Sequence, residues 1–376
     1  MSASPSVDEV RQRLQRHEHY LSMDPNNPRL LAEVIDLHLL LGQAEQAQQT
    51  VTTALEAFPE DPYFRFRQSH VWIAQERWED AAALLSALAT VLIDPAVAHN
   101  LAYAWFRLGK YARAREMLAP LVQDGKAAPD SVVLYLRSLH HLREIREALR
   151  VAELHLATLT DPQFLGTVAL LYLDDGQLDA ARRLSRQAAV APQRPIESWV
   201  VDGTLALADG ELDAARRSFE GALALQPRDG RSWSGLGMVS LMQQDLPRAR
   251  EQLQRAASYL PQHIGTFHAL AWCHVLSGDL PPAEQAFEQA LAIDRNFGES
   301  HGGLAVVYAL QKKTALAQQA IRRANGLDAG GLSARFAQMI LDGDVPDQDA
   351  FRQMARDAVS ARIGNVAQKL VSNFLR

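Results

Sequence analysis

Apolar and polar positions along the chain form pairs of segments, each about a dozen residues long and each with a helical period. Residues 231–261, RSWSGLGMVSLMQQDLPRAREQLQRAASYLP, contain one such pair, with Trp233 and Leu236 in the first segment and Leu253 in the second. Segments of this length favour helices, because strands are usually shorter. We therefore expect pairs of helices and no sheet.

The pair recurs at a nearly constant interval. In its second segment an alanine returns every 33 or 34 residues, and we use it as the anchor position of each repeat. The nine anchor residues are Ala47, Ala81, Ala114, Ala148, Ala181, Ala215, Ala249, Ala283 and Ala317. A fixed period of this length is typical of a stacked array of helical hairpins, since one hairpin alone cannot bury its apolar face.

Small residues and glycines recur around the anchor. Twelve residues before it, seven of the nine repeats carry a small residue, as at Gly203 and Gly237. We expect this residue to face the anchor alanine, so that the two helices pack closely. Five residues before the anchor a glycine recurs, at Gly42, Gly109, Gly176, Gly210 and Gly278. Its tolerance of positive φ suits the turn between the two helices.

The pattern resembles the tetratricopeptide repeat family, whose unit is a 34-residue helical hairpin. The motif residues in the best-matching unit are Trp233, Leu236, Gly237, Ala249, Leu253, Ala256 and Pro261. The unit before it matches at Trp199, Gly203, Ala215, Phe219, Ala222 and Pro227. The resemblance implies an all-α fold, a right-handed superhelical solenoid of about nine helix-turn-helix units with helical caps.

The repeat divides the chain into three parts. Residues 1–27 predict one capping helix, and residues 332–376 predict a C-terminal helical cap with an apolar stripe. The stripe comprises Phe351, Met354, Val359, Ile363, Val366, Leu370, Val371 and Phe374. The array between the caps, 28–331, has units at 28–61, 62–94, 95–128, 129–161, 162–195, 196–229, 230–263, 264–297 and 298–331. Leu136 and His155 replace small residues, which predicts looser packing in the middle units.

Composition narrows the class of protein. A net charge of −6 argues against a nucleic-acid partner, because phosphate contacts need a basic face. The lone cysteine, Cys273, excludes an internal disulfide and favours a reducing compartment. The N-terminal residues lack the basic and apolar order of a signal peptide, and no apolar run is long enough to cross a membrane. We expect a cytoplasmic protein without membrane insertion.

The candidate chemistry in the sequence is weak. The aspartates of 341–349 lack the glycine and glutamate spacing of a calcium loop, so we interpret them as helix caps. The histidines show no metal-ligand spacing with a supporting acid, and Cys273 fits a buried structural thiol. We predict no enzyme activity, no cofactor and no metal.

The family resemblance implies a concave groove lined by the first helix of each unit. Side chains at its groove positions are the candidate partner-binding residues: Tyr63, Phe66, His70, His99, Tyr103, Phe106, Arg107, Arg137, His141, Arg231, Met238, Leu241, Met242, His268 and Trp272. They are largely apolar or aromatic, unlike the Lys/Asn/Lys/Arg set that grips chaperone C-termini in this family. Such a groove suits an amphipathic helix or an extended apolar peptide.

Two functions remain open from the sequence. The chain is a non-enzymatic interaction scaffold, chaperone or adaptor that holds a protein or peptide partner in the groove. Alternatively, it is a structural component of a bacterial secretion or polysaccharide-export assembly that oligomerises through its C-terminal helices. Since the segments outside the repeats are too short for a catalytic domain, an enzyme is the least favoured class.

Overall fold

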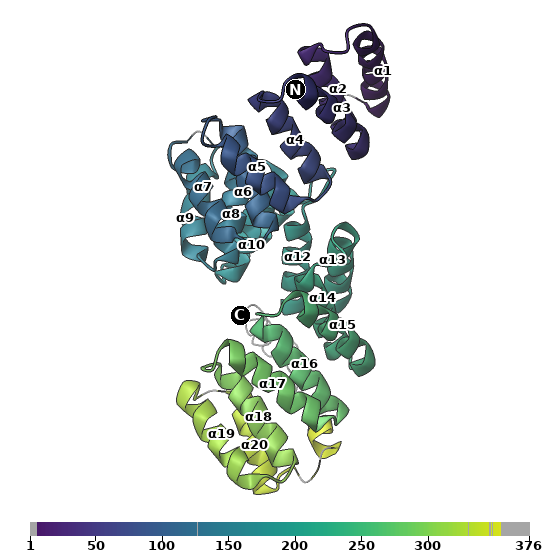
Figure 1. The fold of residues 1–376 in the computed structure, drawn as a ribbon. Coiled ribbons are helices and arrows are strands. Elements are labelled where there is room, and N and C mark those ends of the chain that lie inside the picture. Colours follow the sequence, from purple (N-terminus) through teal and green to yellow (C-terminus); the bar gives the residue numbers. More distant parts are fainter. Residues whose placement is uncertain (1–5, 126, 330, 346, 348, 355–376) are drawn as a thin grey trace. The chain divides into compact units, whose positions relative to one another are not determined.

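The elements of the structure are helices arranged in consecutive hairpins (Figure 1). The computed structural model describes residues 6–125, 127–329, 331–345, 347 and 349–354. Within this part, the first helices of the hairpins are α2 (Pro28–Leu40), α4 (Pro62–Ala74), α6 (Pro95–Arg107), α8 (Pro129–His141), α10 (Pro162–Asp174), α12 (Ile196–Ala208), α14 (Gly230–Met242), α16 (Ile264–Ser277), α18 (Gly298–Leu310) and α20 (Leu332–Asp342). Their partners are α3 (Ala44–Ala57), α5 (Trp78–Leu88), α7 (Tyr111–Gln123), α9 (Ile145–His155), α11 (Leu178–Ala188), α13 (Leu212–Leu225), α15 (Leu246–Tyr259), α17 (Leu280–Ile293) and α19 (Thr314–Leu327). Helix α1 (Val7–Met23) precedes them.

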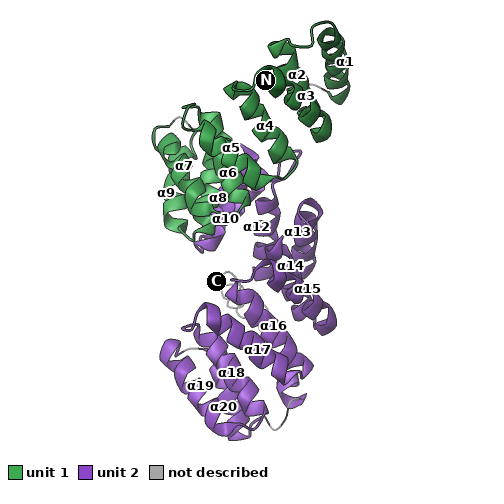
Figure 2. Cartoon of the chain, viewed as in Figure 1, with its two compact units in different colours: residues 1–159 green, residues 160–376 purple. Residues whose placement is uncertain are grey.

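The chain divides into two units, residues 1–159 with α1 to α9 and residues 160–376 with α10 onward (Figure 2). Within each unit, the second helix of one hairpin packs against the first helix of the next. The predicted all-α repeat fold is therefore confirmed.

Capping residues set where many first helices begin. Asn27, Asp61, Asp94 and Asp161 each precede a proline at the first helical position, and each accepts a hydrogen bond from a backbone N–H of the first turn. Such caps satisfy donors that lack a partner inside the helix, and proline at this position loses no helical hydrogen bond. The Asx-Pro pair therefore starts a helix at a defined residue.

The turn inside every hairpin contains one residue in the left-handed conformation, five residues before the anchor alanine. In five hairpins it is the predicted glycine, for example Gly176 with φ 81°. In the other four it is Glu76, Arg143, Gln244 or Lys312, with φ between 57° and 62°. The turn geometry is therefore kept even where the sequence lacks glycine, at a cost in backbone strain.

Each hairpin buries its anchor alanine completely, and all nine anchors have 0% exposure. In the two hairpins where the small residue of the first helix is glycine, however, its nearest neighbour is the residue four places after the anchor and not the anchor itself. A Cβ at Gly203 would lie 2.7 Å from the ring of Phe219, and one at Gly237 would lie 2.5 Å from Leu253. In these two hairpins the expectation that the small residue faces the alanine is thus corrected: the glycine makes room for the larger side chain.

Phe219 also contacts the following hairpin. A Cβ added to Gly235 on α14 would overlap the Phe219 ring, which already lies against Gly203 on α12. The ring is fully buried and fills the space between three helices. Phe287 on α17 lies against Gly303 on α18 in the same way. One side chain therefore joins each of these hairpins to its successor.

Leu136 and His155, the two residues that replace small ones in the middle units, lie in different surroundings. Helices α8 and α9 approach each other closely over a shorter length than the other hairpin partners do. Leu136, at the position where most repeats carry a smaller residue, is fully buried in α8. His155 is half-buried at the end of α9. The looser packing expected near Leu136 is present.

The two ends differ in character. Helix α1 covers α2 through Val10 and Leu14, which are buried against Val34 and Leu37. At the other end, α20 follows α19. Phe351 is buried in the hydrophobic core cluster that also contains Ala337 of α20. Of the predicted C-terminal stripe, Phe351 and Met354 are described, and Val359, Ile363, Val366, Leu370, Val371 and Phe374 lie outside the described residues.

The turn residues predict two opposite effects on stability. Replacement of Gln244 by glycine should raise the free energy of unfolding by about 1 kcal/mol, because glycine adopts the left-handed conformation without the backbone strain of a side chain. Gly176→Ala should lower it by about 1 kcal/mol, since a Cβ there meets no atom within 4 Å and only the backbone is strained. Urea denaturation followed by circular dichroism measures both. Equal stability of all three proteins would contradict this account of the turns.

The close packing around Phe219 predicts a larger loss of stability when a side chain is added beside it. Gly235→Ala should lower the free energy of unfolding by about 1–3 kcal/mol, because the new methyl group must displace the Phe219 ring. Gly326→Ala is the matched control, since Gly326 is also helical but a Cβ there meets nothing within 4 Å. The control should be neutral or gain up to about 1 kcal/mol from helix propensity. A similar response at the two sites would argue against the proposed role of the ring.

Candidate functional site

Aromatic and basic side chains of residues 1–159 gather at the turn ends of consecutive hairpins. Trp78 on α5 and Tyr103 on α6 meet edge to face, with ring centroids 5.8 Å apart. The guanidinium of Arg107 lies 4.1 Å from the centroid of the Trp78 ring, and its Nη1 donates a hydrogen bond of 3.2 Å to the Tyr103 hydroxyl. A cation over an indole face is electrostatically favourable and fixes both side chains.

A second group of rings follows on the next hairpins. His141 on α8 stacks on Tyr111 of α7, with centroids 4.2 Å apart and planes 7° apart. Phe106 meets both rings edge on, at 5.2 Å from Tyr111 and 5.3 Å from His141. We call Trp78, Tyr103, Phe106, Arg107, Tyr111 and His141 together the aromatic strip.

The aromatic strip is accessible but partly supported by packing. Arg107 and His141 are exposed, while its other four side chains are half-buried. Burial also raises the pKa of the Tyr111 phenol, which therefore stays neutral and can donate a hydrogen bond at ordinary pH. Rigid rings with exposed edges are suited to contact a partner, since few rotamers are lost on binding.

Two members of the strip were not predicted from the sequence. Trp78 and Tyr111 are the first residues of α5 and α7, three places before the anchor alanines. Leucine occupies this place in Leu178, Leu212, Leu246 and Leu280. The change from leucine to an aromatic residue is the signal that could have located them.

The remaining candidates of this unit lie nearby on first helices. Tyr63 at the start of α4 is 63% exposed, and Phe66 meets His70 edge on at 4.4 Å. The imidazole Nδ1 of His99 lies 2.9 Å from the Ser131 hydroxyl, a hydrogen bond that joins α6 to α8. Burial lowers the pKa values of His70 and His99, so both rings favour the neutral form. Arg137 is half-buried on α8.

In the second unit the candidates are more engaged with the chain itself. Arg231 on α14 forms a two-armed ion pair with Asp174 on α10, with N–O distances of 3.0 and 2.7 Å. Met238 is 3% exposed and lies in the core, and Leu241 and Met242 are half-buried against that core. As a buried side chain, Met238 offers no surface to a partner, so the structure corrects its assignment to the groove.

His268 is likewise buried, and it positions Trp272. The Trp272 Nε1–H donates to His268 Nε2 at 3.0 Å, and His268 Nδ1 lies 3.2 Å from the Ser300 hydroxyl. Burial lowers the pKa of His268 to about 4, which leaves the imidazole neutral and able to accept from the indole. His268 is therefore a supporting residue and not a groove surface, while Trp272 stays partly exposed.

Other chemistry in the described part of the chain is sparse. Among the described residues no group of three or more metal-ligand side chains converges, and none of their helices is long and apolar enough to cross a membrane. Asp347 accepts a hydrogen bond of 2.8 Å from the Ala350 backbone, which agrees with its interpretation as a helix cap. Cys273 is buried, and burial raises the pKa of its thiol to about 11.

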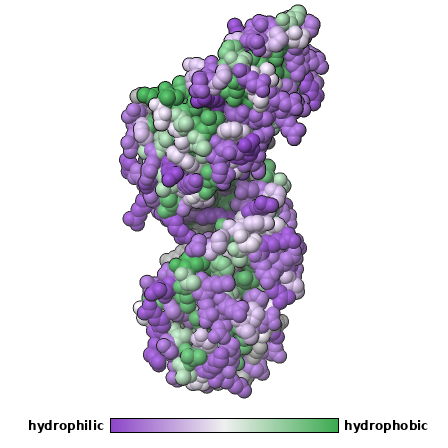
Figure 3. Space-filling view, in the orientation of Figure 1, coloured by the Kyte–Doolittle hydropathy of each residue, from purple (hydrophilic) through white to green (hydrophobic). Residues whose placement is uncertain are grey.

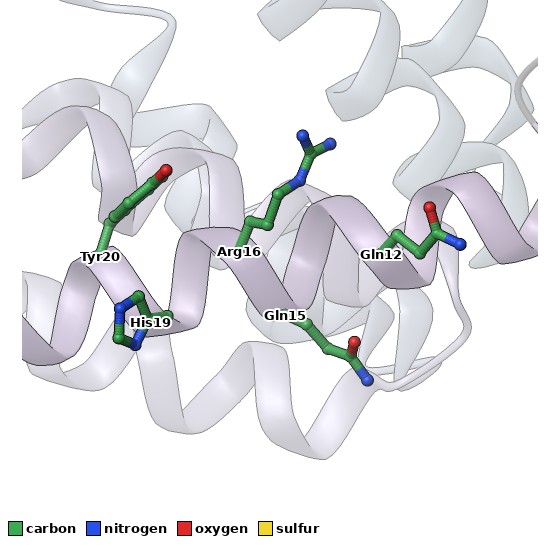
Figure 4. Close-up of a pocket in the computed structure, with 5 residues that line it drawn as sticks. All are labelled: Gln12, Gln15, Arg16, His19 and Tyr20. Atoms are coloured by element: carbon green, nitrogen blue, oxygen red, sulfur yellow. The ribbon is translucent and has the colours of Figure 1, made fainter.

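Two surface features are less suited to a site. A shallow depression on α1 is lined by Gln12, Gln15, Arg16, His19 and Tyr20, and Figure 4 shows these side chains spread along a single helix without converging. Figure 3 shows that apolar residues on one face form several small patches among polar ones in both units. The aromatic strip remains the best-organised accessible group.

Comparison with family models gives three matches, all described as tetratricopeptide repeat. They cover residues 11–67, 95–120 and 202–262, so they fall in both units. No curated protein matches the sequence.

Solved structures with a similar fold are distant in sequence. Cut9 in the APC/C heterotetramer Cut9–Hcn1 is 13% identical, with a TM-score of 0.50 over 89% of this chain and 94% of that one. The human IFIT1 dimer with m7Gppp-AAAA is 16% identical, with a TM-score of 0.52 over 99% of this chain and 93% of that one. At such identities the likeness shows the all-helical repeat fold alone.

The burial of Cys273 predicts a slow thiol. With a pKa of about 11, only about one thousandth of the thiol is ionised at pH 8, and the side chain is also shielded from reagent. Reaction with Ellman's reagent should be at least about a hundredfold slower in the folded protein than in guanidinium chloride. Leu316→Cys, at a position 44% exposed, should add one fast-reacting thiol. Rapid labelling of the folded wild-type protein would contradict the buried position.

Proposed function

Because the chain is a tetratricopeptide repeat protein, we propose that it is a non-catalytic scaffold that holds a helix or extended peptide of a partner protein on the aromatic strip. The repeats support protein binding in general. The adaptor or chaperone role and the choice of this surface are our proposal. The cluster of Trp78, Tyr103 and Arg107 with Phe106, Tyr111 and His141 is the observation that carries it.

The chemistry of the strip indicates what the partner should offer. The rings of Tyr103, Phe106 and Tyr111 are half-buried, so an apolar partner side chain can complete their burial. Arg107 keeps an exposed guanidinium, whose nearest carboxylate is that of Glu76 at 3.9 Å. This distance leaves room for a closer acidic group. We infer a partner segment with apolar side chains and at least one Asp or Glu.

Two other functions rank lower on the same observations. Human IFIT1 was solved with m7Gppp-AAAA, but this chain has a net charge of −6, and we propose no nucleic-acid partner for it. The alternative, a part of a secretion or polysaccharide-export assembly, requires oligomerisation through the C-terminal segment. Residues 355–376 of that segment lie outside the described part of the chain. We propose no cofactor and, from the single cysteine, a cytoplasmic location.

The first test locates the partner on the protein. A photo-crosslinking amino acid at position 107, expressed in the native cell, should yield a covalent adduct with a partner protein, because Arg107 lies within the aromatic strip. The same amino acid at Leu154, which is 70% exposed on α9, is the control and should yield no such adduct. Adducts at both positions, or at 154 alone, would move the binding surface away from the strip.

The second test measures the contribution of the rings. A peptide from the crosslinked partner segment should bind the Tyr103→Ala/Phe106→Ala variant at least about tenfold more weakly than the wild type, by fluorescence anisotropy. Tyr20→Ala/Met23→Ala removes exposed apolar side chains of α1 and should bind as the wild type does. Equal affinity for all three proteins, with helicity unchanged, would refute the assignment. A labelled single-stranded RNA should show no specific binding.

A further inference from the structure

The repeat spacing continues beyond the ninth hairpin. Helix α20 begins at Leu332, which is 34 residues after the start of α18 at Gly298. It packs against both helices of the ninth hairpin, and more extensively against α18 than against α19. By the same spacing, the anchor position of a tenth hairpin is 34 residues after Ala317, at Phe351. The chain therefore begins a tenth repeat.

This tenth repeat cannot close as the others do. The nine anchor alanines are fully buried where two helices touch, and a phenylalanine ring at that position would overpack the contact. In addition, α20 ends after 11 residues at Gly343, whose φ is 85°, while the first helices before it have 13 or 14 residues. The phenylalanine at the anchor position and the shorter first helix set this repeat apart from the nine before it.

The residues after α20 instead return to an earlier hairpin. Phe351 is completely buried, and its ring stacks on Trp272 of α16, with centroids 6.3 Å apart and planes 17° apart. The ring of Phe336 on α20 meets the Phe351 ring edge on, with centroids 6.2 Å apart. Trp272 belongs to a first helix two hairpins before α20, at a position assigned to the groove from the sequence. The chain thus covers part of its own groove.

We call residues 345, 347 and 349–354 the returning segment. Its apolar side chains Val345, Phe351 and Met354 belong to or pack against the core cluster, while Asp347 and Asp349 are exposed. Residues 349–354 are helical and are capped by Asp347. The burial of Phe351 and Val345 ties these residues to the surface that they cover.

The surface beneath the returning segment is held by its own contacts. His268 accepts from the Trp272 indole and is linked to Ser300 on α18, which fixes the orientation of the indole. Phe287 also packs edge on against Trp272, at 5.8 Å. These contacts come from α16 to α18 and do not involve the returning segment. The orientation of the Trp272 indole is therefore supported by the repeats themselves.

We propose that the surface around Trp272 and Phe336 is a second binding site, which accepts a helical segment with an aromatic anchor, and that the returning segment occupies it in cis. A partner with such a helix, an aromatic residue flanked by acidic ones, displaces the returning segment. Tethering gives the segment a high effective concentration, so a free competitor must bind well to replace it. This site lies in residues 160–376 and is distinct from the aromatic strip.

The probe for this proposal is a labelled synthetic peptide with the sequence of residues 344–376, and the protein is the full chain. Wild-type protein should bind it weakly, because the site is filled. Phe351→Ala should bind it at least about tenfold more tightly, since the internal anchor is lost. Adding Trp272→Ala should abolish this gain, and a peptide with alanine at position 351 should not bind. The Tyr103→Ala/Phe106→Ala changes should have no effect, which separates this site from the proposed function.

A second experiment guards against misfolding of the Phe351→Ala variant. A protease site inserted between Asp344 and Val345 allows the segment to be severed in the folded wild-type background. The labelled peptide should then exchange into the site while circular dichroism stays unchanged. Failure of the peptide to exchange, or loss of helicity on cleavage, would overturn the proposal and make the segment a permanent part of the core. Equal binding by wild-type and Phe351→Ala proteins would overturn it as well.

Discussion

The distance between the two helices of a hairpin is the constraint on which the rest of the structure depends. All nine anchor alanines are fully buried, so the helices can approach no further, and no larger side chain fits. The bulk needed to fill the interior is supplied four residues later, by Phe219, Leu253 and Phe287, against glycines of adjoining first helices. Because the rings of Phe219 and Phe287 also touch the next hairpin, helix spacing and hairpin stacking are determined together there.

This constraint also decides which positions are free to vary. Residues between the helices are restricted, whereas the turn ends of the hairpins tolerate leucine in one unit and Trp78 or Tyr111 in the other. Surface chemistry therefore changes along a backbone that stays nearly periodic. The aromatic strip and the Trp272 surface are two such local variations, one open and one covered by the chain itself.

Periodicity explains how much could be predicted. Helix pairs, turn glycines and buried alanines follow from local spacing, because each repeat has nearly the same neighbours. The burial of Met238 and His268 did not follow, since groove positions near the core depend on side chains from adjacent hairpins. Trp78 and Tyr111 were missed because they begin second helices. The contact of Phe351 with Trp272 joins residues far apart in sequence, and no repeat of 34 residues encodes such a pair.

The four turns without glycine have a consequence for how the chain holds together. Glu76, Arg143, Gln244 and Lys312 are in strained conformations, so their hairpins are intrinsically weaker than those with glycine. In a one-dimensional nearest-neighbour system, a weak element persists only through coupling to the elements beside it. In residues 160–376, the hairpins with Gln244 and Lys312 alternate with the glycine hairpins of Gly210 and Gly278. We therefore expect that the strained hairpins fold only together with their neighbours, and that the array is complete only when adjacent hairpins fold cooperatively.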